Sequence, residues 1–112
     1  MVTQKRVANK GEINMNLTEE EIGYIMASLI GDKFRLLRIV AQGEENENTT
    51  EPLGVVLMLL DKLKENISGV YAQNIALLHK QEEEKLKSET GMTSYDIFTS
   101  LASKYNNGSE FN

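Results

Sequence analysis

Residues 18–41 read TEEEIGYIMASLIGDKFRLLRIVA, and this stretch sets the fold class of the 112-residue chain. Thr18 with Glu21 three residues later is the pattern of a capping box, and consecutive glutamates suit the positive end of a helix dipole. Apolar residues then recur at helical spacing on one face: Ile22, Ile25, Met26, Leu29, Ile30, Leu36, Leu37 and Val40. We predict a long amphipathic helix that runs to about Ala41 and is closed by Gly43.

The weak point of this first helix is Gly31, which is followed by Asp32. A glycine inside a helix costs about 1 kcal/mol relative to alanine. The sequence therefore leaves two alternatives open, one continuous helix or two helices that meet at Gly31.

A second helix follows an acidic loop over residues 42–51, QGEENENTTE, which has four acids and no base. We expect Thr49 or Thr50 to cap this helix and Pro52 to lie in its first turn, where a missing amide costs nothing. The sequence LGVVLMLLDKLKENI over 53–67 is apolar nearly all round, so the helix must be central to a bundle or lie at a subunit contact. The residues predicted as core or dimer seam are Leu53, Val56, Leu57, Leu60 and Leu63.

The remaining chain predicts two more helical stretches. A turn over 66–69 leads to a third amphipathic segment that ends near Ser88, and we expect its charged second half, HKQEEEKLKSE over 79–89, to project into water. Gly91 stops it, and Thr93 or Ser94 begins a last helix. The apolar face of that helix contains Ile97, Phe98, Leu101, Ala102 and Tyr105. The predicted fold is an all-α bundle of three or four helices, either a monomer or a homodimer.

The predicted organisation is one domain. Residues 1–16 form a flexible basic tail, residues 17–105 the helical domain and residues 106–112 a frayed C-terminus. Lys10-Gly11-Glu12 can be encoded as a ribosome-binding sequence just ahead of Met15. We therefore predict that Met15, rather than Met1, is the natural start and that the tail is translated leader; an intact mass of the natural protein that includes residues 1–14 would contradict this. The alternative is a basic tail that contacts a nucleic acid or an acidic partner.

Composition excludes several classes of function. The chain has no cysteine, so it holds no disulfide, thiolate nucleophile or cysteine-rich zinc site. Its longest uncharged apolar run, residues 53–60, is far short of the ~20 residues of a membrane helix. We therefore expect a cytoplasmic protein that does not enter the membrane.

We find no pattern typical of an enzyme. His79 is the single histidine, and the glycines do not have the spacing of phosphate-binding loops. His79 with Glu82 and Glu83 at i+3 and i+4 has a spacing that suits a metal, but on so charged a helix it more simply indicates a solvated face. We predict no catalytic residue, no cofactor and no metal site.

The charge pattern favours protein partners. With 12 basic and 17 acidic residues the chain carries a net charge of -5, which opposes direct nucleic-acid binding. Two exposed groups are candidates for a partner surface: Lys33, Arg35 and Arg38, and Glu82, Glu83 and Glu84. We predict a small acidic helical protein that binds or regulates a protein partner without catalytic activity. The alternative is a DNA mimic that inhibits a nucleic-acid-binding host or defence protein.

In general style, a short chain rich in Lys and Asn with a TEEE-capped first helix resembles small reading frames of phages and mobile elements in low-GC Gram-positive bacteria. The resemblance implies an accessory role, and no residue roles are carried over from it.

Overall fold

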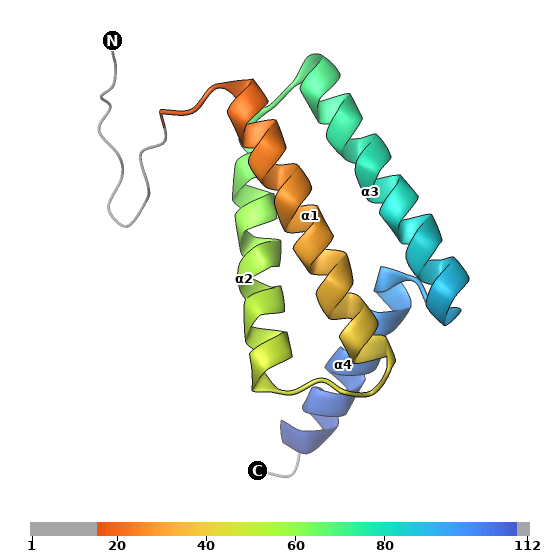
Figure 1. Ribbon diagram of the computed structural model, residues 1–112. Coiled ribbons are helices and arrows are strands. Elements are labelled where there is room, and N and C mark those ends of the chain that lie inside the picture. The colour runs from red at the N-terminus through yellow and green to blue at the C-terminus, as the bar shows by residue number, and fades with distance from the viewer. Residues whose placement is uncertain (1–15, 110–112) are drawn as a thin grey trace.

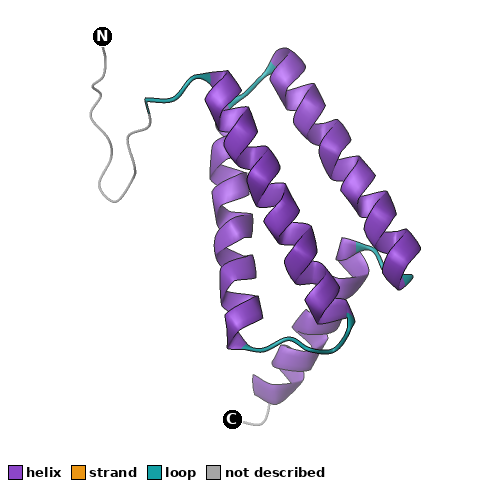
Figure 2. Ribbon diagram, viewed as in Figure 1, coloured by secondary structure: helices purple, strands orange, loops and turns teal. Residues whose placement is uncertain are grey.

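Helices account for almost all of the chain that the structure describes. The computed structural model describes residues 16–109, with side chains to residue 104. Within these bounds there are four α-helices and no strand, which confirms the all-α prediction (Figures 1 and 2). They are α1 (Glu19–Ala41), α2 (Glu47–Leu63), α3 (Gly69–Thr90) and α4 (Ser94–Ser109), and a 3-10 helix, η2 (Lys64–Asn66), continues α2. Residues 1–15, with Met15, and residues 110–112 lie outside the described part, and α4 extends past Tyr105.

Both ends of α1 form as predicted. The Glu21 amide donates to Thr18 Oγ1 at 3.0 Å, and the Thr18 amide donates to Glu21 Oε1 at 2.8 Å, so the capping box is complete. At the other end Gly43 adopts a positive φ of 77° and donates its amide to the Val40 carbonyl.

The helix α1 passes through Gly31 without a break. Ile30 and Phe34, on either side of this glycine, are both fully buried in the core. Packing on both sides of the glycine therefore outweighs its poor helix propensity, and the continuous alternative is the correct one.

The start of α2 differs from the prediction. Asn46 is the N-cap, and its side-chain oxygen accepts the Asn48 amide at 2.8 Å. Thr49 and Thr50 therefore lie inside the helix, and Pro52 lies in its second turn rather than its first. The prediction was wrong because a carboxamide earlier in the loop satisfies the free amides one turn sooner.

The arrangement has α1 at its centre. Figure 1 shows α2 antiparallel to α1 along one side, α3 roughly parallel to it along the other, and α4 crossing near the C-terminal end of α1. Both α2 and α3 pack extensively on α1 and hardly approach each other. The helices α2 and α3 are thus the two edges of a layer whose middle is α1.

The core lies where α4 meets the other helices. Phe34 and Leu37 of α1 are wholly buried there together with Leu86 of α3 and Ile97 of α4. Phe34 was absent from the predicted apolar face of the first helix. A second, smaller cluster joins Ile22 and Met26 to Leu63 near the start of α1.

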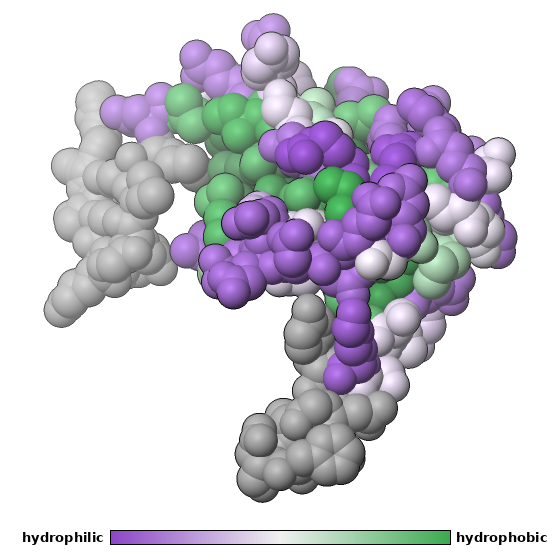
Figure 3. All heavy atoms as spheres, turned by 60° about the horizontal axis from the view of Figure 1, so that its bottom comes forward, coloured by the Kyte–Doolittle hydropathy of each residue, from purple (hydrophilic) through white to green (hydrophobic). Residues whose placement is uncertain are grey.

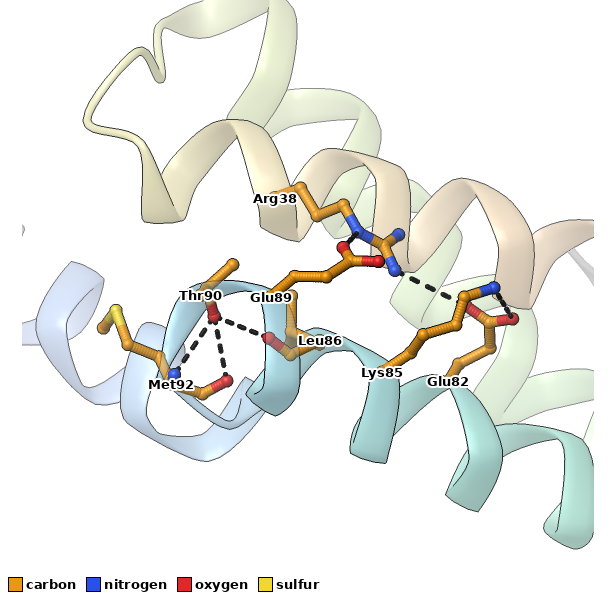
Figure 4. A network of polar contacts seen from close by, with 7 residues as sticks. All are labelled: Arg38, Glu82, Lys85, Leu86, Glu89, Thr90 and Met92. Carbon is orange, nitrogen blue, oxygen red and sulfur yellow. Dashed lines mark hydrogen bonds and ion pairs between the residues drawn. The ribbon is translucent and has the colours of Figure 1, made fainter.

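The second half of α3 does not project freely into water as predicted. Leu86 has no exposed surface, and Arg38 of α1 reaches Glu89 of α3 with its Nε at 2.5 Å from Oε1 (Figure 4). One leucine in the charged run is enough to hold this half of the helix against α1, because it packs into the core cluster with Phe34 and Ile97.

The connection between α3 and α4 forms as predicted at Gly91 and Thr93. Gly91 caps α3 with a φ of 78°. Thr93 and Asp96 exchange amide-to-side-chain hydrogen bonds of 3.0 and 3.1 Å, a second capping box. In the same turn the Thr90 hydroxyl donates to the Leu86 carbonyl and accepts the Met92 amide (Figure 4). These bonds fix the angle at which α4 leaves α3.

Candidate functional site

An open groove of about 510 Å³ lies beside α1. Its floor is on α1, its two walls are on α2 with η2 and on α3, and most of its lining is apolar. The lining residues are Met26, Ile30, Lys33, Leu57, Leu60, Asp61, Lys64, Ile67, Ala72, Ile75, Ala76 and His79.

The groove exists because α4 covers only part of the trough between α2 and α3. Ile30 belongs both to the groove and to the core cluster that contains Ile97 of α4. One helical turn further along α1, Phe34 has no exposed surface. The groove is therefore the part of the trough that α4 leaves uncovered.

A lysine and a histidine face each other in this groove. Lys33 Nζ donates to His79 Nε2 at 2.6 Å, which joins α1 to α3. The Lys33 Nζ also lies 5.2 Å from the centroid of the Phe34 ring, and the Phe34 and His79 rings pack against each other in a T-shaped arrangement. Lys33 is only 8% exposed, so its charge is largely removed from water.

Burial lowers the pKa of both Lys33 and His79. For Lys33 the nearby Glu83 carboxylate opposes this effect and raises the pKa. Burial also lowers the pKa of His79, the charge on Lys33 lowers it further, and Glu83 opposes both effects. The arrangement favours a neutral imidazole that accepts a hydrogen bond from a charged lysine.

At the rim of the groove Lys64 forms an ion pair with Asp61 at 2.8 Å, with both side chains well exposed. The hydrogen bond with Asp61 raises the pKa of Lys64. The groove thus holds two lysines and a histidine against one aspartate, although the chain as a whole is acidic. Such a site favours an apolar ligand that carries a negative charge.

The three predicted basic residues do not share one exposed surface. Lys33 is buried in the groove, which corrects the prediction that it is exposed. Its position follows from the spacing of Met26, Ile30 and Lys33, which puts all three on the buried face of α1. Arg35 is exposed and lies 3.5 Å from Asp32, and Arg38 turns toward Glu89 and Glu82 of α3 (Figure 4).

The three predicted glutamates are also divided. Glu82 lies between Arg38 and Lys85, at 3.9 and 3.7 Å (Figure 4). Glu83 accepts the amide and the hydroxyl of Ser94, which ties α3 to the start of α4. Glu84 is exposed. Two of the three carboxylates therefore hold helices together.

The five residues predicted as core or dimer seam of the second helix occupy two different environments. Leu53, Val56 and Leu63 are buried inside the chain, whereas Leu57 and Leu60 are half-buried and line the groove. Contacts within the chain thus already cover three of the five residues.

Sequence reasoning missed the pairing of Lys33 with His79 and associated His79 with Glu82 and Glu83. Among the described residues no group of three or more His, Cys, Asp or Glu side chains could hold a metal ion. The signal that could have placed Lys33 is its register with Met26 and Ile30. No local pattern indicated that His79 lies opposite it.

In the part of the chain that the structure describes, the fold is an all-α globule of four helices, and the groove lies open on its surface. No protein-family model, no curated protein and no solved structure matches the chain. In the described part, none of the helices has the length and apolar character needed to cross a membrane.

Proposed function

We propose that this chain is a cytoplasmic accessory protein without catalytic activity, whose groove binds an amphipathic helix of a partner protein. The bound helix would place apolar side chains along Ile30, Leu60 and Ile75 and a carboxylate against Lys33. The observation that carries the proposal is the buried Lys33 amine in an apolar groove that the described helices leave uncovered.

The position of α4 supports a helix as the occupant. This helix is itself amphipathic, with Ile97 buried and Ser100 exposed, and it packs on the same side of α1 that forms the groove. The described part of the chain therefore already packs one amphipathic helix against this side of α1, where α4 crosses it. A helix from a partner would use the same ridges and spacing.

Charge supports an acidic residue on that helix. Lys33 has an imidazole rather than a carboxylate as its close partner. An ion pair between the Lys33 ammonium and a partner carboxylate would be stronger in this apolar groove than the same pair in water. Lys64 at the rim is already paired with Asp61, so the selection against a basic helix rests on Lys33.

The DNA-mimic alternative stays a prediction. Glu82 and Glu83, two of the acids it would use, are engaged by Arg38, Lys85 and Ser94 within the chain. Among the described residues, no cluster of acids supports the DNA-mimic function more strongly than the groove supports binding of a partner helix.

The test selects helical peptides from a displayed library against the full chain and measures their affinity for matched variants. Ala76→Trp fills the groove from α3, whereas Leu77→Trp adds the same ring at a neighbouring position that is 54% exposed. We expect the selected peptides to carry an acid among apolar residues at i, i+3, i+4 and i+7. They should lose about tenfold or more in affinity for Ala76→Trp and for Lys33→Met, since each removes about 1.4 kcal/mol or more of binding energy.

Two results would contradict the proposal. Peptides whose affinity is the same for Ala76→Trp as for the original chain bind elsewhere. Peptides that prefer basic residues, or that bind Lys33→Met as tightly, show that the ammonium group does not recognise a carboxylate.

A further inference from the structure

The outer face of α2, away from α1, carries an exposed apolar strip. Val55 is 51% exposed, Met58 56% and Leu59 38%, although each lies on a well-formed helix. The strip lies at an edge of the layer, where none of the other helices in residues 16–109 covers it. Figure 3 shows hydrophobic side chains reaching the surface among hydrophilic ones, including on the side where Figure 1 places α2.

Opposite charges lie at the two ends of this strip. Glu51, Val55, Met58 and Lys62 follow one another at spacings of four, three and four residues, so they form one line along the helix. Glu51 and Lys62 are both exposed, and neither forms an ion pair with another described residue. The line is acidic at its beginning and basic at its end.

We propose that this strip binds a second copy of the chain, with the two α2 helices antiparallel about a two-fold axis. In that arrangement Glu51 of each copy faces Lys62 of the other, and Val55 faces Met58. A parallel arrangement would put like charges together, so the charges select the antiparallel one.

This surface differs from both the predicted seam and the groove. Leu53, Val56 and Leu63 face the core, and Leu57 and Leu60 face the groove, whereas the strip lies on the opposite side of α2. A homodimer of this kind leaves the groove of each copy open. The dimer and the proposed partner binding can therefore be tested separately.

The expected dimer is weak. A helix of 17 residues is about 25 Å long, and one such contact buries less than the roughly 800 Å² per partner of a standard interface. We expect a dissociation constant on the order of 10–100 μM.

Sedimentation velocity of the full chain, from low micromolar to about 1 mM, tests the proposal. We expect a monomer–dimer equilibrium that Val55→Lys weakens by about tenfold or more, because it places two charges in an apolar contact. Val70→Lys is the matched control, since Val70 is 65% exposed on α3, and it should leave the dimer unchanged.

A charge exchange tests the orientation. Glu51→Lys alone and Lys62→Glu alone should each weaken the dimer by roughly tenfold, because two attractive pairs become repulsive. The double variant restores both pairs and should recover most of the affinity. Circular dichroism should show the same helix content throughout, since all of these positions are exposed.

A chain that stays monomeric at about 1 mM overturns the proposal. So does a dimer that responds to Val70→Lys and not to Val55→Lys. A dimer that the double variant fails to restore overturns the antiparallel pairing. Peptide binding by Val55→Lys should equal that of the original chain, so a failure of the dimer is distinct from a failure of the groove.

Discussion

A buried lysine hydrogen-bonded to a histidine is the most unusual residue-scale feature of the described part of this chain. Lys33 loses water without gaining a carboxylate at hydrogen-bond distance, since its close partner is His79 Nε2 at 2.6 Å. Both pKa values are lowered as a result. Such a pair lowers stability in order to keep a charge inside an apolar groove, which is typical of binding sites.

The pH dependence of stability should report this pair. In the unfolded chain His79 titrates near its usual pKa of about 6.5, and in the folded chain its pKa is lower. Between the two values the unfolded state binds more protons, so the free energy of unfolding falls as the pH drops below about 6.5. Urea unfolding between about pH 8 and pH 5 measures the fall, and His79→Gln should remove it.

The same pair supplies a control for that prediction. Lys33→Met keeps the buried stem and removes the charge that lowers the pKa of His79, while burial and Glu83 remain. The pKa of His79, followed by NMR of its ring protons, should rise toward its usual value, and the fall in stability should shrink. A folded pKa at or above the unfolded value in the original chain would contradict this account.

At the scale of single helices, the sequence predicted where helices begin and end better than it predicted which helices contact each other. The capping box at Thr18 and the glycines at 43 and 91 depend on neighbouring residues only, and the structure confirms them. Asn46 was missed because several Asn and Thr residues in one loop can each cap a helix, and local sequence does not rank them.

Replacement of two glycines by alanine should change the free energy of unfolding in opposite directions. Gly31 lies inside α1 with open space at its Cβ position, so Gly31→Ala should raise the free energy of unfolding by about 0.5–1 kcal/mol. Gly91 has a φ of 78°, which strains any side chain, so Gly91→Ala should lower it by about 1 kcal/mol or more. Urea unfolding measures both, and a stabilising Gly91→Ala would show that this turn does not need glycine.

At the scale of the whole molecule, the sequence predicted an all-α bundle but not the groove. The groove depends on α2 and α3 lying on opposite sides of α1, and periodicity says which face of a helix is apolar, not which neighbour covers it. For the same reason the sequence left open whether Leu86 belongs to the apolar face of the third helix, although it lies in the main core cluster.

Leu86 should therefore hold α3 in place. Leu86→Ala leaves a cavity next to Phe34 and Ile97 and should lower the free energy of unfolding by about 2–4 kcal/mol. Leu77→Ala removes the same atoms from a position that is 54% exposed, and its effect should stay within about 0.5 kcal/mol. Equal effects in thermal or urea unfolding would mean that the second half of α3 does not pack on the core.

The central place of α1 also determines where this chain can change over evolutionary time. Seven residues of α1 are buried, while in α3, which the structure describes in full, the buried set is Leu86 alone. Substitutions in α1 are therefore constrained by neighbours on several sides, whereas most positions of α3 can vary at little cost to the fold. Selection for a new partner would act most freely on α3, which also forms one wall of the groove.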